Sequence, residues 1–262
     1  MAKTQRPCLI VGNWKMYKTI EEATAFIDSI LPMLDKSSCQ VMLAVPYTCI
    51  KPLADKVKGT PIIIGAQNMN DAMEGAFTGE VAAVMLKEAG ANFVLIGHSE
   101  RRTIFQESNA FINRKVQRAV ACELKPILCI GETYDEREQN QTEQLLKTQL
   151  DECLAGVAKD AANTVVLAYE PIWAIGTGLA ATPELVGSAL ATCRKILGDI
   201  WGEKEAMKVP ILYGGSVNPK NAETYLSLSE NNGLLIGSAS LAPDSFAKII
   251  ALRQNAAVAT KS

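Results

Sequence analysis

The chain has 262 residues, of which 48% are apolar, and its formal net charge is −2. This length and composition allow a large buried core, and the balanced charge excludes the basic surface that nucleic-acid binding requires. No apolar run approaches the roughly 18 residues of a membrane span. The first residues lack the long apolar region of a signal peptide. We therefore expect a cytoplasmic protein with no membrane or nucleic-acid partner.

The cysteines and histidines limit the kinds of site that the chain could carry. There are seven cysteines, an odd number, and none stands in a Cys-x-x-Cys pair. A disulfide framework is therefore not expected, and reduced thiols inside apolar runs fit a cytosolic compartment. His98 is the single histidine. We expect neither a metal site nor a cofactor, because no metal-ligand cluster or nucleotide-binding loop stands out.

Eight short apolar runs predict β-strands along the whole chain. They lie at residues 8–11, 41–45, 62–65, 93–96, 126–130, 164–168, 209–213 and 233–236. Because the runs do not alternate with polar residues, they are typical of parallel strands that are buried on both faces.

Amphipathic stretches between these runs predict helices at residues 23–34, 79–88, 108–123, 135–159 and 183–197. Thr19 and Glu22 form a candidate capping box, and Gly90 suits a helix C-terminus. Thr182 followed by Pro183 predicts a second helix start. Alternating strands and helices indicate either a closed barrel or an open doubly wound sheet. The count of eight and the length favour the first: an α/β, closed eight-stranded parallel (β/α)8 barrel in a single domain, residues 1–262.

Polar residues gather where the predicted strands end, which in such a barrel is the catalytic rim. Asn13 and Lys15 follow the first strand, His98 the fourth and Glu170 the sixth. Glu170 could take a proton from carbon, and His98 could donate a hydrogen bond to a carbonyl oxygen. Lys15 would place a positive charge beside an anionic substrate, with Asn13 as an amide donor. Taken singly, His98 could equally be a structural histidine, and Lys15 a solvated charge.

Glycine-rich segments complete this rim. Residues 214–216 (Gly-Gly-Ser) and 237–238 (Gly-Ser) would let backbone N–H groups approach a phosphate. The segment after Glu170 is long for a tight turn and reads as a lid that excludes water. Its residues are Pro171, Ile172, Trp173, Ala174, Ile175, Gly176, Thr177 and Gly178.

Five segments together resemble the triosephosphate isomerase family. They are Gly-Asn-Trp-Lys-Met at 12–16, Gly-His-Ser-Glu-Arg-Arg at 97–102, Cys-Ile-Gly-Glu at 129–132, Tyr-Glu-Pro-Ile-Trp-Ala-Ile-Gly-Thr-Gly at 169–178 and Tyr-Gly-Gly-Ser-Val at 213–217. The resemblance covers the chain from about Cys8 to Leu241 and implies a TIM barrel. It further implies the cofactor-free interconversion of dihydroxyacetone phosphate and glyceraldehyde 3-phosphate in glycolysis and gluconeogenesis.

The resemblance also implies residue roles. In this family a glutamate is the base and a neutral histidine polarises the carbonyl, which assigns these roles to Glu170 and His98. Ser99 and Glu100 would sit beside Lys15 and Asn13. The phosphate would be held by Gly176, Ser216, Gly237 and Ser238, and Tyr213 with Ser216 would latch the closed lid.

The family is usually homodimeric. The segment 67–80 is long for a strand–helix connection and is similar to the family's dimer loop. Thr78 would then approach Asn13 and Lys15 of the partner, and Met16 would lie near that contact.

Two departures from the family pattern stand out. Leu-Ala-Ala occupies 179–181, where the family often has Lys-Thr-Ala, and Gly237-Ser238 replaces a common Gly-Gly. The first concerns the lid's hinge and the second concerns space around the phosphate.

Other functions remain open at this point. One is a different phosphate-binding barrel enzyme, such as a Schiff-base aldolase with Lys15 as nucleophile. A metal-dependent epimerase is disfavoured, because one histidine leaves too few of its usual ligands. A third is a catalytically silent barrel that acts as a binding protein.

Overall fold

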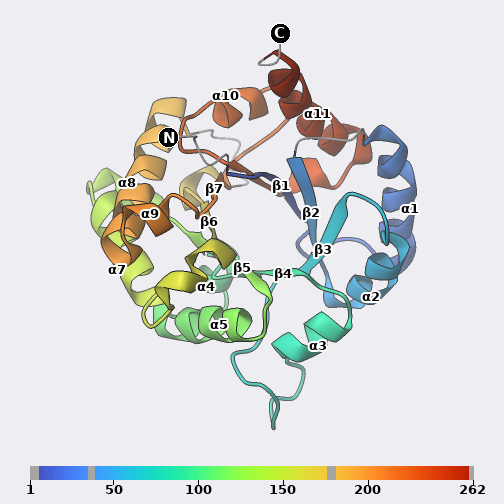
Figure 1. Ribbon diagram of the computed structural model, residues 1–262, viewed down its shortest axis with the longest axis horizontal. Coiled ribbons are helices and arrows are strands. Elements are labelled where there is room, and N and C mark those ends of the chain that lie inside the picture. The colour runs from blue at the N-terminus through green and yellow to red at the C-terminus, as the bar shows by residue number, and fades with distance from the viewer. Residues whose placement is uncertain (1–5, 35–38, 176–180, 260–262) are drawn as a thin grey trace.

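The computed structural model describes residues 6–34, 39–175 and 181–259. Its eight strands are all parallel and form one closed barrel in chain order, in which β1 pairs with both β2 and β8 (Figure 1). The strands are β1 (Cys8–Asn13), β2 (Cys39–Val45), β3 (Ile62–Ala66), β4 (Phe93–Ile96), β5 (Lys125–Ile130), β6 (Val166–Tyr169), β7 (Ile211–Tyr213) and β8 (Gly233–Ile236). The predicted closed barrel is confirmed, and every strand overlaps its predicted run.

Helices surround the barrel (Figure 1). They are α1 (Ile20–Ile30), α2 (Tyr47–Lys56), α3 (Ala83–Glu88), α4 (Ser99–Thr103), α5 (Asn109–Ala121), α6 (Tyr134–Glu138), α7 (Thr142–Cys153), α8 (Pro183–Trp201), α9 (Glu203–Ala206), α10 (Ala222–Leu226) and α11 (Pro243–Ala259). Short 3₁₀ segments are η1 (Leu31–Met33), η2 (Lys159–Thr164), η3 (Ile172–Ala174) and η4 (Ser238–Ser240). None of the described helices combines the length and apolar character that crossing a membrane needs.

The predicted helix starts at Thr19 and Thr182 are confirmed. Thr19 forms a capping box with Glu22, and the Thr182 side chain accepts a hydrogen bond from the Leu185 N–H. The prediction of one helix over residues 135–159 is wrong: the segment divides into α6 and α7, and residues 154–158 are not helical. Asn140 lies between the two helices and has a φ of 57°, and this left-handed backbone conformation ends α6.

Two further differences have local causes. The helix predicted from residue 79 begins only at Ala83, because Gly79 takes a φ of 91°. Helix α2 was not predicted, and its interior Pro52 breaks the usual helical sequence pattern.

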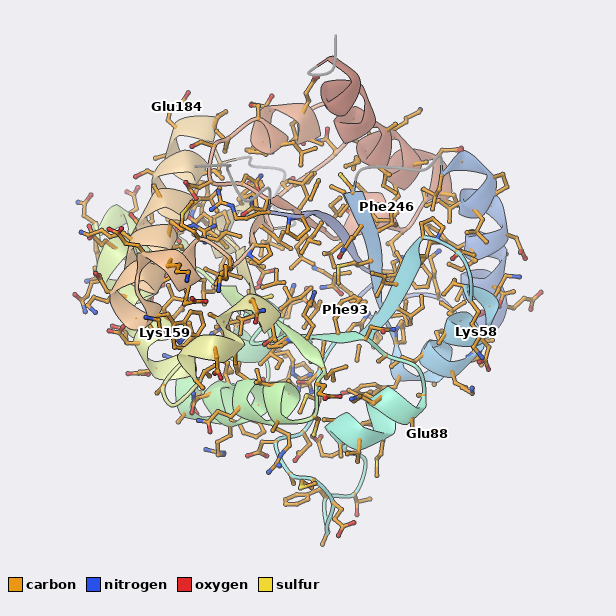
Figure 2. All side chains as sticks on the ribbon, in the orientation of Figure 1. Lys58, Glu88, Phe93, Lys159, Glu184 and Phe246 are labelled. Carbon is orange, nitrogen blue, oxygen red and sulfur yellow. The ribbon has the colours of Figure 1, made fainter. Side chains whose placement is uncertain are left out.

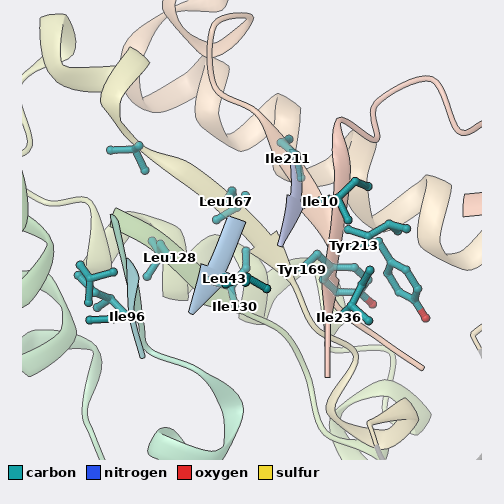
Figure 3. Close-up of a cluster of buried hydrophobic side chains, with 14 of the residues drawn as sticks. Ile10, Leu43, Ile96, Leu128, Ile130, Leu167, Tyr169, Ile211, Tyr213 and Ile236 are labelled. Carbon is teal, nitrogen blue, oxygen red and sulfur yellow. The ribbon is translucent and has the colours of Figure 1, made fainter. Parts of the chain in front are cut away.

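The barrel has two apolar cores, which explains why the strand sequences do not alternate. Twelve strand residues form an inner cluster, among them Val11 and Ala168, while their neighbours face the surrounding helices. The outer cluster includes Ile10, Leu43, Leu167 and Tyr169 (Figure 3). Both faces of each strand are therefore apolar.

The same division separates core from surface across the whole molecule. Phe93 lies among the strands, fully buried, while Lys58, Glu88 and Glu184 point outward from the helical ring (Figure 2). Gly65 makes room for the phenyl ring of Phe93, since a Cβ at Gly65 would lie 2.4 Å from that side chain.

Candidate active site

At the carboxyl ends of the strands, the inward-facing positions are occupied by polar side chains. Asn13 stands two residues after Val11 of the inner core, and Glu170 stands two residues after Ala168 of the same core. Successive side chains in a strand alternate between faces. Both polar residues therefore face the inside of the barrel, just beyond the end of its apolar core.

A cavity of about 180 Å³ lies at this rim. Seven residues predicted for catalysis or phosphate binding line it: Asn13, Lys15, His98, Glu170, Ser216, Gly237 and Ser238. Ile175 and Leu235 supply apolar walls. Residues from five strand ends are therefore brought around one small space, which suits a small polar ligand.

Glu170 is 2% exposed and is held by two partners. The backbone N–H of Ser99 donates to its Oε2 over 3.2 Å, and His98 Nε2 lies 3.2 Å from its Oε1. A Cβ on Gly214 would lie 2.9 Å from Glu170 Cγ, so this neighbour must be small. The carboxylate is thus aimed and sheltered before any ligand arrives.

The hydrogen bonds of His98 define its tautomer. The backbone N–H of Glu100 donates to His98 Nδ1 over 3.2 Å, at the start of α4. A nitrogen that accepts a hydrogen bond carries no proton, so the proton of the neutral ring is on Nε2. That Nε2–H is the group that points to Glu170.

Lys15 is positioned by its backbone as well as its charge. Its φ is 51°, and its N–H donates to Asn13 Oδ1 over 3.0 Å. Gln67 Nε2 donates to the Lys15 carbonyl over 2.8 Å, and Lys15 Nζ lies 2.6 Å from Glu100 Oε1. Gln67 was not predicted, because nothing in its sequence surroundings marks a contact 52 positions away.

The first part of the predicted lid is anchored to Glu132, in the segment that follows β5. Glu132 is fully buried, and its Oε1 accepts hydrogen bonds from Tyr169 Oη and Trp173 Nε1, each over 3.0 Å. The Arg137 guanidinium stacks 5.0 Å from the Trp173 ring. Burial raises the pKa of Glu132, against the hydrogen bonds from Trp173, its own backbone and Tyr169. The predicted lid residues Gly176, Thr177 and Gly178 and the departure at 179–180 lie outside the described residues.

The predicted phosphate segments face this cavity. A Cβ on Gly215 would lie 2.1 Å from Tyr213 Oη, so only glycine fits there. Asn221 Nδ2 donates to the Ser216 carbonyl over 2.9 Å and fixes that turn. Ser238 is exposed at the cavity wall, at the start of η4.

Cys129 is a neighbour of Glu170 that the sequence placed only in the core. Burial and the Glu170 carboxylate raise the pKa of its thiol well above the ordinary value. The thiol therefore stays protonated beside the carboxylate. Within the described ranges, no three His, Cys, Asp or Glu side chains are grouped to hold a metal ion.

A sequence model described as triosephosphate isomerase matches residues 8–253. The chain belongs to the triosephosphate isomerase family. The triosephosphate isomerase of Protochlamydia amoebophila (strain UWE25) is 51% identical over 250 residues, which cover 95% of each chain. That of Caldanaerobacter subterraneus subsp. tengcongensis is 42% identical over 246 residues, 94% of this chain and 99% of its own.

A solved structure agrees with the sequence comparison. The crystal structure of triosephosphate isomerase from Bartonella henselae matches with a TM-score of 0.85 at 39% identity, over 94% of this chain and 98% of that one. The family membership that the sequence segments predicted is therefore confirmed, along with isomerase as the class of enzyme.

Proposed function

We propose that this isomerase interconverts dihydroxyacetone phosphate and D-glyceraldehyde 3-phosphate, with Glu170 and His98 as the proton-handling pair. The observation that carries the proposal is their geometry: a sheltered carboxylate and a neutral Nε2–H, 3.2 Å apart, at the wall of one small cavity. The cavity is also lined by the cationic side chain of Lys15 and by the turns at residues 214–216 and 237–238, whose backbone N–H groups could bind a phosphate.

In the proposed reaction, Glu170 removes a proton from the carbon next to the carbonyl. Negative charge then develops on the carbonyl oxygen, and His98 Nε2–H donates to it as the enediolate forms. Glu170 returns the proton to the neighbouring carbon, and the hydroxyl proton of the first carbon passes through His98 Nε2 to the oxygen of the former carbonyl, so that carbonyl and hydroxyl exchange places. The Ser99 N–H, which bonds Glu170 Oε2, keeps the carboxylate in line.

The charged and small residues hold the substrate during these steps. Lys15 and Asn13 face its oxygens, and the backbone of Ser216, Gly237 and Ser238 surrounds its phosphate. Gly176 would add a further N–H when the lid is over the site. Glu100, paired with Lys15 Nζ, sets the direction of the ammonium group.

The aldolase alternative is disfavoured by that ion pair. A Schiff base needs a neutral amine with a free lone pair, whereas Lys15 Nζ lies 2.6 Å from a carboxylate oxygen. The silent-barrel alternative is disfavoured because Glu170, His98 and Lys15 line one cavity together with the predicted phosphate-binding residues Ser216, Gly237 and Ser238.

A coupled assay of glyceraldehyde 3-phosphate turnover tests the function. We expect turnover that resists metal chelators and no borohydride-trapped adduct on Lys15. An adduct on Lys15 would favour the aldolase, and absence of turnover would favour the binding protein.

We propose a homodimer as the working form. Among described residues, seven large apolar side chains more than half exposed fall in the segments that follow β1, β3 and β4: Met16, Tyr17, Met73, Phe77, Met85, Ile104 and Phe105. Met16 is 95% exposed. A contiguous exposed apolar patch is typical of a protein–protein interface, and we propose that these side chains contribute to one. The loop 67–82, which extends from the barrel beside α3 (Figure 1), would carry Thr78 toward the partner's rim.

A cytoplasmic location is proposed as well. Its support is the odd number of cysteines without a Cys-x-x-Cys pair, and a substrate class that belongs to central sugar metabolism. Fractionation of cells that express a tagged chain would test it.

A further inference from the structure

Gln149 is a buried amide on the otherwise apolar inward face of α7. It is 7% exposed and lies on the same buried face as Leu146, Leu150 and Cys153. Its Oε1 accepts the N–H of Gly131 over 2.9 Å, and its Nε2 donates to the carbonyl of Gly131 over 3.2 Å. One side chain therefore satisfies both backbone groups of the residue that follows β5. Because both hydrogen bonds of this buried amide are made, they fix the position of the Gly131 peptide, which an apolar side chain could not do.

Gly131 in turn packs against the backbone of Glu170. A Cβ at Gly131 would lie 1.8 Å from the carbonyl oxygen of Glu170, so only a glycine allows this approach. The preceding residue, Ile130, accepts the N–H of Glu170 over 2.7 Å. A shift of the Gly131 peptide would therefore move the backbone that carries the Glu170 carboxylate.

Glu132, the next residue, holds the chain on both sides of Glu170. Its carbonyl accepts the N–H of Ile172 over 2.9 Å, and its carboxylate accepts from Tyr169 and Trp173. Gly131 and Glu132 together thus contact the residue before Glu170, Glu170 itself and the start of the lid.

We infer that Gln149 is a positioning residue for Glu170: it fixes the Gly131–Glu132 segment on which the base and the start of the lid rest. It is not one of the residues that line the cavity, and its two hydrogen bonds go to the Gly131 backbone. This inference rests on the proposed function of Glu170. Helix α7, on the outside of the barrel, would thus help to position the catalytic base Glu170.

Gln149→Met tests it, because methionine keeps the length of the side chain and removes both hydrogen bonds. We expect kcat to fall roughly 10-fold to 100-fold, the size of effect that a misplacement of about 1 Å produces. KM should change less than about twofold, because the phosphate turns lie on other strands. Affinity for a phosphorylated hydroxamate that mimics the enediolate should fall in parallel with kcat, while affinity for inorganic phosphate stays.

Asn231→Leu is the matched control. Asn231 is also a buried amide that joins two backbone groups, Gly233 N–H over 3.1 Å and Tyr225 C=O over 2.8 Å. It precedes β8 at the opposite end of the barrel. We expect it to lower the unfolding temperature as Gln149→Met does and to leave kcat within twofold.

A folded Gln149→Met with the kcat of the wild type would overturn the inference, as would an equal loss of kcat in the control. If Gln149→Met does not fold, Gln149→Glu decides, since it keeps the bond to the Gly131 N–H and loses the bond to the carbonyl. An unchanged kcat in that variant would equally overturn it. Failure of the wild type to turn over substrate would instead count against the proposed function.

Discussion

His98 Nε2 lies 3.2 Å from Glu170 Oε1, while His98 Nδ1 accepts the backbone N–H of Glu100. The two contacts together leave one proton on the ring and direct it toward the base. A substrate carbonyl that enters the cavity would take over this hydrogen bond, so the histidine is ready to donate before the reaction begins.

Replacing His98 by glutamine is expected to lower kcat about 100-fold, since a neutral amide donates from a different place and is a weaker donor to developing charge. KM should change little. Steady-state kinetics with both triose phosphates provides the measurement. A kcat within twofold of the wild type would contradict the assigned role.

Glu170→Asp should lower kcat by roughly 100-fold while substrate binding weakens far less, because the shorter side chain retracts the base from the carbon. Glu230→Asp is a suitable control, since Glu230 pairs with Arg194 over 2.9 Å and lines no part of the cavity. An unchanged kcat in Glu170→Asp would rule out the assignment of the base.

Glu132→Gln is expected to alter how stability depends on pH. Burial raises the pKa of Glu132 above 4.5 in the folded protein, so the fold favours its protonated form. The stabilisation from this group is complete below the unfolded pKa and is lost as pH rises through the folded pKa. The unfolding temperature of the wild type relative to the variant should therefore fall as pH rises from about 4.5 toward neutrality.

Thermal unfolding of both proteins across that pH range makes the comparison. Glu184→Gln serves as the control of opposite sign, because hydrogen bonds from its own backbone and from Thr182 lower the pKa of Glu184. A difference between wild type and Glu132→Gln that stays constant with pH would show that Glu132 does not titrate as described.

Lys115→Met should destabilise the fold by about 3 kcal/mol, because it removes one of the two cations that pair with the buried Glu107 carboxylate. Lys115 is 1% exposed, and its Nζ lies 2.6 Å from Glu107 Oε1 and 2.9 Å from Asn68 Oδ1. We expect the lower end of the range usual for breaking a buried ion pair, because Arg101 still pairs with Glu107 in the variant. Urea unfolding measures the loss.

An exposed ion pair provides the contrast to that variant. Lys147 and Asp151 are 2.7 Å apart on the surface of α7. Lys147→Met should leave the urea midpoint nearly unchanged, since surface pairs contribute little. Equal effects of the two lysine substitutions would mean that burial does not govern the Lys115 pair.

Thr78→Arg is expected to weaken the proposed homodimer by placing a bulky charge in the loop that would enter the partner. Sedimentation at decreasing concentration should show monomer appearing earlier than in the wild type, with a loss of activity alongside. Thr224→Arg, at an exposed position of α10, is the control. A Thr78→Arg protein that stays dimeric at the lowest concentration would count against the loop.

Local patterns in the sequence determined much of this protein. The strand runs, the helix starts at Thr19 and Thr182, and the gathering of Lys15, His98 and Glu170 at strand ends could all be read without a structure. Each depends on residues near one another in the chain, where backbone preference and the pattern of apolar residues act directly. The confirmed barrel then placed those strand ends at one rim.

Closure of the barrel decided what the sequence could not. Gln67 reaches the backbone of Lys15 and Gln149 reaches Gly131 across 52 and 18 positions, and nothing local to either glutamine predicts these partners. The buried carboxylate of Glu132 likewise finds Tyr169 and Trp173 only once β5 and β6 are paired. A buried polar group is stable only when its hydrogen bonds are made, and which partners are within reach depends on how the strands and helices pack.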